Sequence, residues 1–323
     1  MNYTPNKTVV ITGASSGIGH ACVAELSRAG WKIFAAVRKA ADQTRLQSED
    51  ANVTAVIMDL QDRVSITAAA GQIAPQLKNR ALGGLVNVAG IGAVQPVEYI
   101  TPQAMQEIFD INVFGQIAVT QAFLPFIRKA HGRIVNISSI GAHIAIPFGG
   151  LLNASKSAFG LLTDTLRLEL RPFGIRVSTV EPGAISTPAV EKTLGHIESV
   201  IRDLPEPGAA QYAEMLRNFA KRAYARESNG SSPDVVARAA VHALTAQRPR
   251  IRYRVGNHAQ LLGALPRILP DRILDAIRMR MLGLPTEFGA LGNDEQSEQE
   301  PSQRKEPTKA AAQRRREVSP RFV

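Results

Sequence analysis

Short apolar runs rich in β-branched residues alternate with longer segments of helical periodicity over the first 255 residues. The first run, 7–12, precedes a helical pattern over 17–30 and a second run over 31–37. Apolar runs without polar alternation are typical of strands covered on both faces. Such strands alternating with helices predict βαβ units and a doubly wound α/β fold with one parallel sheet. Five further strands are expected, with the last at the sheet edge: 53–59, 82–88, 132–138, 174–180 and 250–255.

Two segments depart from this alternation. A charged, helical insertion follows the sixth strand, where doubly wound sheets bind ligands, so it is expected to cover a substrate. Near the C-terminus, an amphipathic pattern predicts two short helices broken at Pro266 and Pro270. The polar end of the chain is almost free of large apolar residues, which predicts disorder. The expected organisation is a single domain over 1–258 with a helical lid at about 187–232, an amphipathic extension over 259–290 and a disordered tail over 293–323.

The chain has a formal net charge of +10, and much of the excess is local. Between Arg248 and Leu282 there are eight arginines and two aspartates. A solvated basic face is the simpler explanation of this cluster, and contact with an anionic membrane surface is the functional alternative. Nucleic acid is not expected as a partner, because aromatic side chains suited to stacking are not interleaved with the arginines.

Cysteine content and the absence of targeting patterns limit the classes of protein to which the chain can belong. A lone Cys22 excludes an internal disulfide, and six scattered histidines give no metal-ligand spacing, so no metal is expected. The N-terminal residues lack the basic and apolar regions of a signal peptide. No apolar run approaches the roughly 18 residues that span a bilayer. We therefore expect a cytoplasmic protein, with peripheral membrane contact as the alternative.

A glycine-rich loop, TGASSGIG, joins the first strand to the first helix. Its glycines are Gly13, Gly17 and Gly19. Glycines let the backbone turn tightly and let a pyrophosphate approach, and free N–H groups at the helix N-terminus meet the phosphate charge. A purely structural turn is the alternative, but the strand before and the helix after favour a dinucleotide site.

The chain resembles the short-chain dehydrogenases/reductases, and in particular their retinol- and steroid-dehydrogenase-like members. The similarity extends from residue 7 to 255 and, after the glycine loop, includes MDL (58–60), NVAG (87–90), INVFG (111–115), ISSIG (137–141), ASKSA (154–158) and PGAIST (182–187). It implies a Rossmann fold, oxidoreductase activity, a nicotinamide dinucleotide and a homo-oligomer. The expected cofactor-binding residues are Gly13, Ser15, Ser16, Gly17, Ile18, Gly19, Arg38, Asp59, Leu60, Asn87, Ala89, Gly90, Lys156, Pro182, Gly183, Ile185 and Thr187.

The end of the second strand favours NADP(H) over NAD(H). An acidic side chain there would accept hydrogen bonds from both ribose hydroxyls and would repel a 2′-phosphate. Val37 occupies that position, and Arg38 and Lys39 follow it. A guanidinium suits a phosphate dianion. An exposed basic turn would explain the two cations alone, but the missing acid argues independently for NADP(H).

The expected catalytic site lacks its usual proton donor. In the family that the chain resembles, a tyrosine four residues before the lysine exchanges a proton with the substrate oxygen, and Leu152 stands there. The resemblance assigns substrate-oxygen binding to Ser139, a water relay to Asn112 and nicotinamide-ribose binding to Lys156. Leu152 and Lys156 share one helix face. His143 could replace the donor because imidazole titrates near neutrality, or it could simply form the pocket wall.

Two hypotheses of function follow. The first is an NADP(H)-dependent oxidoreductase that interconverts a hydroxyl and a carbonyl on an apolar, steroid-, retinoid- or lipid-like substrate. The second is a non-catalytic NADP-binding homologue that acts as a sensor or partner. Leu152 favours the second hypothesis, whereas intact Ser139, Lys156, Asn112 and Thr187 favour the first.

Overall fold

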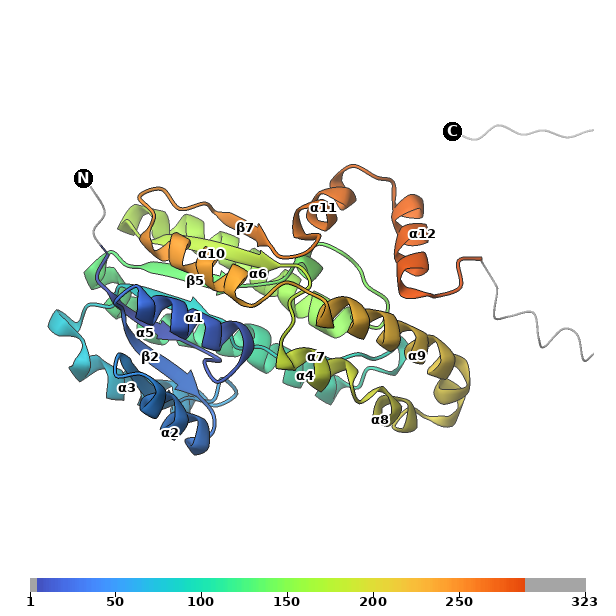
Figure 1. The fold of residues 1–323 in the computed structure, drawn as a ribbon, viewed down its shortest axis with the longest axis horizontal. Coiled ribbons are helices and arrows are strands. Elements are labelled where there is room, and N and C mark those ends of the chain that lie inside the picture. Colours follow the sequence, from blue (N-terminus) through green and yellow to red (C-terminus); the bar gives the residue numbers. More distant parts are fainter. Residues whose placement is uncertain (1–4, 288–323) are drawn as a thin grey trace, which may run out of the picture. The chain divides into compact units, whose positions relative to one another are not determined.

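In the computed structural model, which describes residues 5–287, seven parallel strands form one sheet in the order β3-β2-β1-β4-β5-β6-β7 (Figure 1). The doubly wound sheet expected from the sequence is confirmed, with its seventh strand at an edge. The strands are β1 (Thr8–Ile11), β2 (Lys32–Val37), β3 (Val53–Ile57), β4 (Gly84–Asn87), β5 (Arg133–Ile137), β6 (Arg176–Pro182) and β7 (Arg252–Val255).

Successive residues of a strand point to opposite faces of the sheet. Both faces are apolar here, and helices cover both of them. Val9 and Ile11 join one buried cluster and Val10 joins another. The first cluster is completed by α1 (Gly17–Arg28), α2 (Ala40–Glu49) and α10 (Asp234–Thr245). The second is completed by α3 (Arg63–Ile73), α5 (Gln116–Ala130) and α6 (Gly150–Leu170). The apolar strands that lack polar alternation are therefore buried on both faces, as expected.

The order of the strands reverses between β1 and β4. The chain moves from β1 outward to β2 and β3, then returns to place β4 on the other side of β1. Connections leaving neighbouring strands at such a point diverge and open a crevice at the carboxyl ends of the strands, which is where these sheets bind ligands. The glycine loop follows β1 and residues 88–91 follow β4, so both predicted cofactor segments meet there.

Three helices follow β6 and pack over the loop that follows β5. They are α7 (Pro188–Leu194), α8 (Ile197–Arg202) and α9 (Glu206–Ser228), within the segment expected to form a lid. Phe148 is the main contact in the loop, with its ring edge-on to Tyr212 and to Phe219 at centroid separations of 6.1 and 5.5 Å. Its φ of 62° is unusual for a bulky residue. Aromatic packing thus holds this loop in a strained backbone conformation.

The C-terminal extension forms α11 (Ala259–Ala264), a short 3₁₀ turn η7 (Leu265–Arg267) and α12 (Asp271–Leu282), and the breaks fall at the two predicted prolines. Gly263 of α11 lies so close to the body that an added Cβ would be 2.7 Å from Ile140 and 2.8 Å from Arg254. Helix α12 packs against α9. Residues up to 284 belong to one compact unit. The tail predicted to be disordered, 293–323, lies outside the described residues.

The remaining elements connect this framework. Helix α4 leads directly into a π-helical segment that no sequence pattern had indicated. These elements are the 3₁₀ turns η1 (Ala74–Gln76), η2 (Lys78–Arg80), η3 (Val97–Tyr99), η5 (Ile140–Ala142) and η6 (Arg171–Phe173), the helix α4 (Pro102–Phe109) and the π-helical η4 (Asp110–Gly115).

Candidate active site

The glycine loop is shaped by close approaches to two other loops. Gly13 has a φ of 64°, and an added Cβ would lie 2.9 Å from the Cα of Ala89. Gly17 has a φ of 53°, and a Cβ there would lie 3.2 Å from the Cβ of Thr187. Thr12 ties the loop to the end of β4, because its hydroxyl accepts from the backbone N–H of Ala89 at 3.1 Å. The loops after β1, β4 and β6 therefore meet around the predicted dinucleotide site.

The rest of the loop leads into α1. Ser16 is the exposed N-cap residue, and its side chain makes no capping hydrogen bond, which leaves the first N–H groups of the helix available to an anion. The carbonyl of Ser15 accepts from Arg45 at 2.8 Å. Ile18 packs against the first buried cluster, and Gly19 packs on the backbone of the loop itself. This cradle of small residues fits a dinucleotide phosphate.

Two arginines lie near the end of β2. Val37 is buried, whereas Arg38 is exposed and forms no ion pair within residues 5–287. Arg45 is already neutralised, since it binds Asp42 at 3.2 Å and Glu49 at 2.9 Å. Arg38 and Lys39 are thus the exposed cations at the end of β2 that form no ion pair within the described residues.

Asp59 and Leu60 follow β3 as expected for residues near an adenine. The Asp59 carboxylate accepts a hydrogen bond from the backbone N–H of Gln61 at 3.0 Å. The backbone N–H of Asp59 donates to the hydroxyl of Ser65 at 3.0 Å. Leu60 is buried and packs against Gly115, at the end of the π-helical segment. The turn is therefore fixed without a ligand.

Asn87 has a different environment from the one the motif suggested. Its side-chain amide donates to Thr120 at 3.0 Å and to Asn136 at 2.9 Å, inside the sheet. The side chain is therefore used to join β4 to β5 and α5. Any cofactor contact at this position is left to the backbone that follows, and it stays a prediction.

The loop after β6 closes the other side of the site. Gly183 donates its N–H to Val255 at 2.8 Å, which holds the loop against the edge strand. Pro182 ends β6, and Ile185 is buried beneath the loop. Thr187, the N-cap of α7, then contacts the glycine loop. Pro182, Gly183 and Ile185 therefore shape the loop after β6. The fourth predicted position, Thr187, contacts the glycine loop that follows β1.

Asn112 is buried in the π-helical segment, and its side chain is fixed on both sides. Its amide donates to the carbonyl of Ile91 at 2.9 Å, and its carbonyl accepts from the N–H of the same residue at 2.9 Å. The amide also donates to Ser155 of α6 at 3.0 Å. Asn112 therefore joins the loop after β4 to the helix that carries the lysine. Segments of π-helix often occur at functional sites.

Lys156 is buried with few polar contacts. Its ammonium donates to the carbonyl of Ile137 at 3.2 Å. Burial lowers the pKa of Lys156 from 10.5 to about 8. A Cβ added at Gly90 would lie 3.3 Å from its Nζ and 3.1 Å from the Oδ1 of Asn112. Lys156 and Asn112 thus both face Gly90. The residue before it, Ala89, contacts the glycine loop.

Ser139 and Leu152 border the same site. The Ser139 hydroxyl accepts from the N–H of Gly141 at 3.0 Å, and this contact orients it at the start of the loop after β5. Leu152 is half-buried, and its Cδ2 would lie 3.7 Å from a Cβ at Gly92. Thr193 of the lid approaches the same glycine. The side chain at this position is therefore an apolar group with no exchangeable proton.

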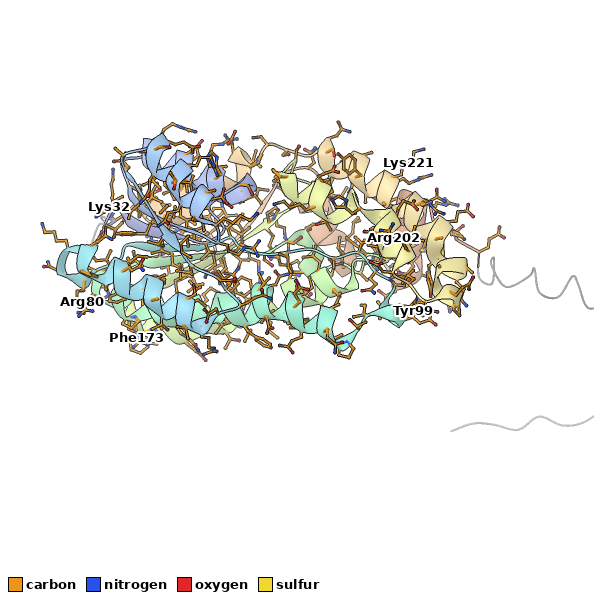
Figure 2. The ribbon with its side chains drawn as sticks, turned by 90° about the horizontal axis from the view of Figure 1, so that it is seen from below. Lys32, Arg80, Tyr99, Phe173, Arg202 and Lys221 are labelled. Atoms are coloured by element: carbon orange, nitrogen blue, oxygen red, sulfur yellow. The ribbon has the colours of Figure 1, made fainter. Side chains whose placement is uncertain are left out.

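No other tyrosine of the described chain takes over this position. Each of the four described tyrosines hydrogen-bonds through its hydroxyl to a group outside the site. Figure 2 shows Tyr99 beside the lid helices, at the opposite end of the molecule from Arg80 and Phe173. The pairs are Tyr99 with Gln211, Tyr212 with Glu98, Tyr224 with Glu191 and Tyr253 with His242.

His143 lies in the loop after Ser139 and is bound from behind. Its Nε2 contacts Glu181 at 2.8 Å, and Arg252 and Arg254 contact the same carboxylate at 2.6 and 3.1 Å. Glu181 is almost completely buried. Burial opposes its ionisation, but hydrogen bonds from His143 and the two arginines outweigh that effect and hold the pKa of Glu181 below its usual value. This network gives His143 a structural role, and its role as an acid stays a prediction.

Sequence reasoning missed Arg45 and Glu181. A signal for Glu181 was available, because a carboxylate inside a buried strand needs a charged or hydrogen-bonding partner. Arg45 offered no signal, since its contact with the glycine loop depends on where α2 lies. Within residues 5–287, no cluster of potential metal ligands is present. No helix of the same residues is long and apolar enough to cross a membrane.

Solved structures with the same architecture include one in complex with NADP. A short chain dehydrogenase from Burkholderia cenocepacia in complex with NADP is 25% identical, with a TM-score of 0.63, and the match covers 86% of this chain and 98% of that one. A short-chain dehydrogenase from Streptomyces avermitilis has the same identity and TM-score and the match covers 86% and 96% of the two chains.

Curated relatives align over nearly their whole length. Human retinol dehydrogenase 16 is 34% identical over 284 residues, which is 86% of this chain and 89% of the relative. The 17-beta-hydroxysteroid dehydrogenase type 6 of Rattus norvegicus is 32% identical with the same coverage. The 3-amino-tetrahydro-pyrrolizinone reductase of Xenorhabdus hominickii is 34% identical, over 83% of this chain and 93% of the relative. The family model for short chain dehydrogenases matches residues 7–197. The chain belongs to the short chain dehydrogenase family and is an oxidoreductase homologue of the retinol and steroid dehydrogenases.

Proposed function

We propose that the protein is an NADP(H)-dependent oxidoreductase that interconverts a hydroxyl and a carbonyl on an apolar, steroid-, retinoid- or lipid-like molecule. The observation that supports this most is the continuity of the backbone at Ala89 and Gly90. Ala89 contacts the glycine loop, and Gly90 faces both Lys156 and Asn112. One strip of chain therefore joins the predicted phosphate cradle to the residues at the reacting end.

The proposed cofactor fits the residues that surround its site. The small residues of the glycine loop leave space for a pyrophosphate, and Arg38 supplies an uncompensated cation for a 2′-phosphate. A bound nicotinamide dinucleotide supplies or accepts a hydride. Lys156 would bind the hydroxyls of the nicotinamide ribose through its ammonium, and the Ser139 hydroxyl would donate a hydrogen bond to the substrate oxygen.

Proton transfer to that oxygen cannot involve residue 152. Leucine there has no exchangeable proton, so the donor is His143, a water molecule or a group of the substrate. Because Glu181 already engages Nε2 of His143, the histidine would have to act through Nδ1. We therefore propose a slow or unusual reaction, as the loss of a positioned acid typically costs about 10²–10⁴ in rate.

A second candidate function is a non-catalytic NADP-binding homologue that serves as a sensor or partner. Leu152 is the specific observation that favours it. One experiment separates the two: NADPH oxidation with a panel of apolar ketones and aldehydes, beside a direct NADPH-binding titration. Binding with turnover supports the oxidoreductase, and binding without turnover on any carbonyl supports the sensor.

Arg38→Asp should remove the preference for NADPH. We expect the parent to bind NADPH about 10–100-fold more tightly than NADH, the range expected for a charge-assisted contact. The substituted carboxylate should repel the 2′-phosphate and favour the unmodified ribose. Titration of both cofactors measures the ratio. Arg28→Asp, at the far end of α1, makes the same charge change and should leave the ratio unchanged. Equal affinity of the parent for both cofactors would contradict the assignment.

An anionic membrane surface is a further proposed partner, through the C-terminal extension. Leu261, Ile268, Ile273 and Met281 are exposed there, and the same extension carries the exposed arginines Arg272 and Arg280. Exposed apolar area and basic charge together are what a stable peripheral attachment requires. We expect acidic vesicles to co-sediment more protein than neutral vesicles at low salt. A chain ending at residue 292 should show the same preference for acidic vesicles as the full chain. Equal retention by both vesicles would exclude this contact.

A second copy of the chain is also proposed as a partner. Helix α6 exposes Leu161, Leu162 and Leu168, which lie on the outer surface of the sheet's helical layer. A group of exposed leucines on one helix is typical of a surface that another protein covers. This supports the expected homo-oligomer.

A further inference from the structure

Helix α7 of the lid extends from the glycine loop to the loop after β4. Its N-cap residue, Thr187, contacts Gly17, and Thr193 near its other end contacts Gly92. The two threonines are six positions apart, which corresponds to about 9 Å along an α-helix. The helix therefore places Thr193 away from the predicted phosphate cradle, beside the position of the missing acid.

Thr193 and Leu152 meet at Gly92. A Cβ added to this glycine would lie 3.0 Å from the hydroxyl oxygen of Thr193, 3.1 Å from its Cγ2 and 3.7 Å from the Cδ2 of Leu152. These atoms therefore surround one point, and the hydroxyl is the nearest of them. Thr193 thus brings a hydroxyl to the place where the side chain at 152 has none.

The hydroxyl of Thr193 is available to a ligand. Within residues 5–287 it makes no hydrogen bond to the protein, and its side chain is half-buried. Every other threonine inside an α-helix of this range donates its hydroxyl to the carbonyl four residues earlier, a common contact of helical threonines. Thr193 differs because its hydroxyl faces Gly92 instead of the preceding turn. The threonines that make the helical contact are Thr44, Thr67, Thr120, Thr163, Thr165 and Thr245.

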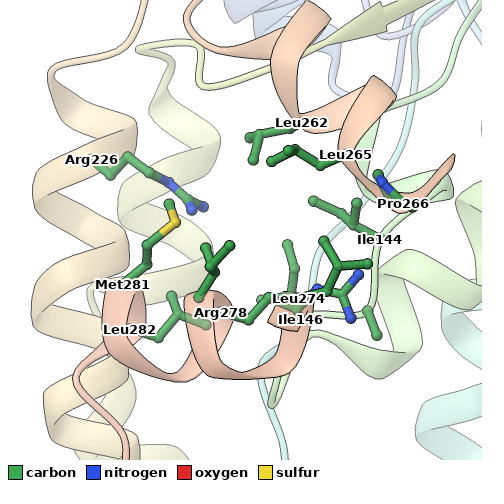
Figure 3. A pocket seen from close by; sticks show the side chains of 12 residues that line it. Ile144, Ile146, Arg226, Leu262, Leu265, Pro266, Leu274, Arg278, Met281 and Leu282 are labelled. Carbon is green, nitrogen blue, oxygen red and sulfur yellow. The ribbon is translucent and has the colours of Figure 1, made fainter. Parts of the chain in front are cut away.

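Packing of the lid holds Thr193 in this place. The next residue, Leu194, is buried in an apolar cluster that includes residues of α9. Glu191 of α7 accepts a hydrogen bond from the hydroxyl of Tyr224 on α9 at 2.8 Å. Helix α9 itself packs beside α12, where a small apolar pocket lies between the two helices and the loop after β5 (Figure 3). Thr193 does not line this pocket, so the pocket and the group at Gly92 are separate.

We propose that Thr193 binds the reacting oxygen of the substrate, in place of the phenol that position 152 lacks. The inference rests on the proposed function, because it concerns the substrate of that same site. A hydroxyl both donates and accepts, so Thr193 would donate to a carbonyl oxygen or accept from an alcohol. It is far less acidic than a phenol, so it holds the oxygen and does not supply the proton. Together with Ser139 it would stabilise the charge that develops on this oxygen during reduction.

Titration of the NADP⁺-loaded full chain with acetophenone tests the proposal, with α-methylstyrene as the probe in which a CH₂ group replaces the carbonyl oxygen. The isosteric substitution Thr193→Val should weaken acetophenone binding about 3–10-fold, the usual loss of one neutral hydrogen bond, and leave α-methylstyrene binding unaffected. Thr193→Ser keeps the hydroxyl and should bind both probes as the parent does. Ser199→Ala is the matched control, since it removes a lid hydroxyl that donates to the carbonyl of His196.

A kinetic readout separates substrate binding from a structural role. Where the parent reduces a carbonyl, Thr193→Val should lower kcat more in the parent than in Leu152→Tyr, because the phenol would hold the same oxygen. A purely structural role would cost the same in both backgrounds, and that result would contradict the proposal.

The binding measurements need no turnover. Acetophenone affinity unchanged by Thr193→Val, an equal loss for α-methylstyrene, or no binding of either probe by the parent would overturn the proposal. Failure of the oxidoreductase function would give a different result, namely binding of acetophenone that depends on Thr193 with no reduction of any carbonyl.

Discussion

Replacing Leu152 with tyrosine should raise carbonyl reduction by about 10²–10⁴-fold, the usual contribution of a positioned general acid. The side chain at 152 is one helical turn from Lys156 on the same face of α6. A phenol there would share the site with a buried ammonium and with the hydroxyl of Ser139. The ammonium would favour the phenolate form and so make the phenol a better proton donor. NADPH oxidation with a carbonyl substrate measures the change.

Leu152→Phe is the matched control, because it adds the ring without the hydroxyl. We expect phenylalanine to leave the rate at or below that of the parent. A parent that is already fast and gains nothing from tyrosine would show that another acid acts. His143→Gln would then be the next variant to assay. If neither parent nor Leu152→Tyr reduces any carbonyl while both bind NADPH, the sensor function is supported.

The fold could be predicted from the sequence because it depends on local patterns. Apolar strands covered on both faces, helices of regular length between them and a glycine loop after the first strand each have their own signature. The prolines at 266 and 270 similarly predicted where the extension breaks. These features do not depend on which distant residue each segment meets.

The candidate site was predictable only in part. Motif order placed Ser139, Asn112 and Lys156 together, but it did not show that Asn112 is buried in a π-helical segment. Nor did it show that His143 is bound by Glu181, because that contact joins residues 38 positions apart. Tertiary contacts of this kind have no local sequence pattern.

Replacing Lys156 with methionine should weaken NADPH binding by about 10–100-fold, since it removes a charged donor to the ribose hydroxyls. The parent has no tyrosine at position 152 to share the effect, so the loss would belong to the lysine alone. Direct titration of NADPH measures it. Lys129→Met, at the exposed end of α5, is the control and should bind NADPH as the parent does. An unchanged affinity in Lys156→Met would show that Lys156 is not a cofactor ligand.

The same substitution should stabilise the cofactor-free protein at pH 7. The folded state holds the Lys156 ammonium away from water, and its pKa is lowered to about 8 from 10.5. Between these two values the unfolded chain binds more protons than the folded chain, so the lysine makes stability rise with pH in that window. Below pH 8 its contribution is unfavourable by at most about 3 kcal/mol. Methionine removes that term and keeps the apolar stem. We therefore expect urea unfolding to give a higher free energy for Lys156→Met than for the parent at pH 7, and a smaller difference at pH 9.5. A difference independent of pH over this range would contradict the burial of a charged lysine.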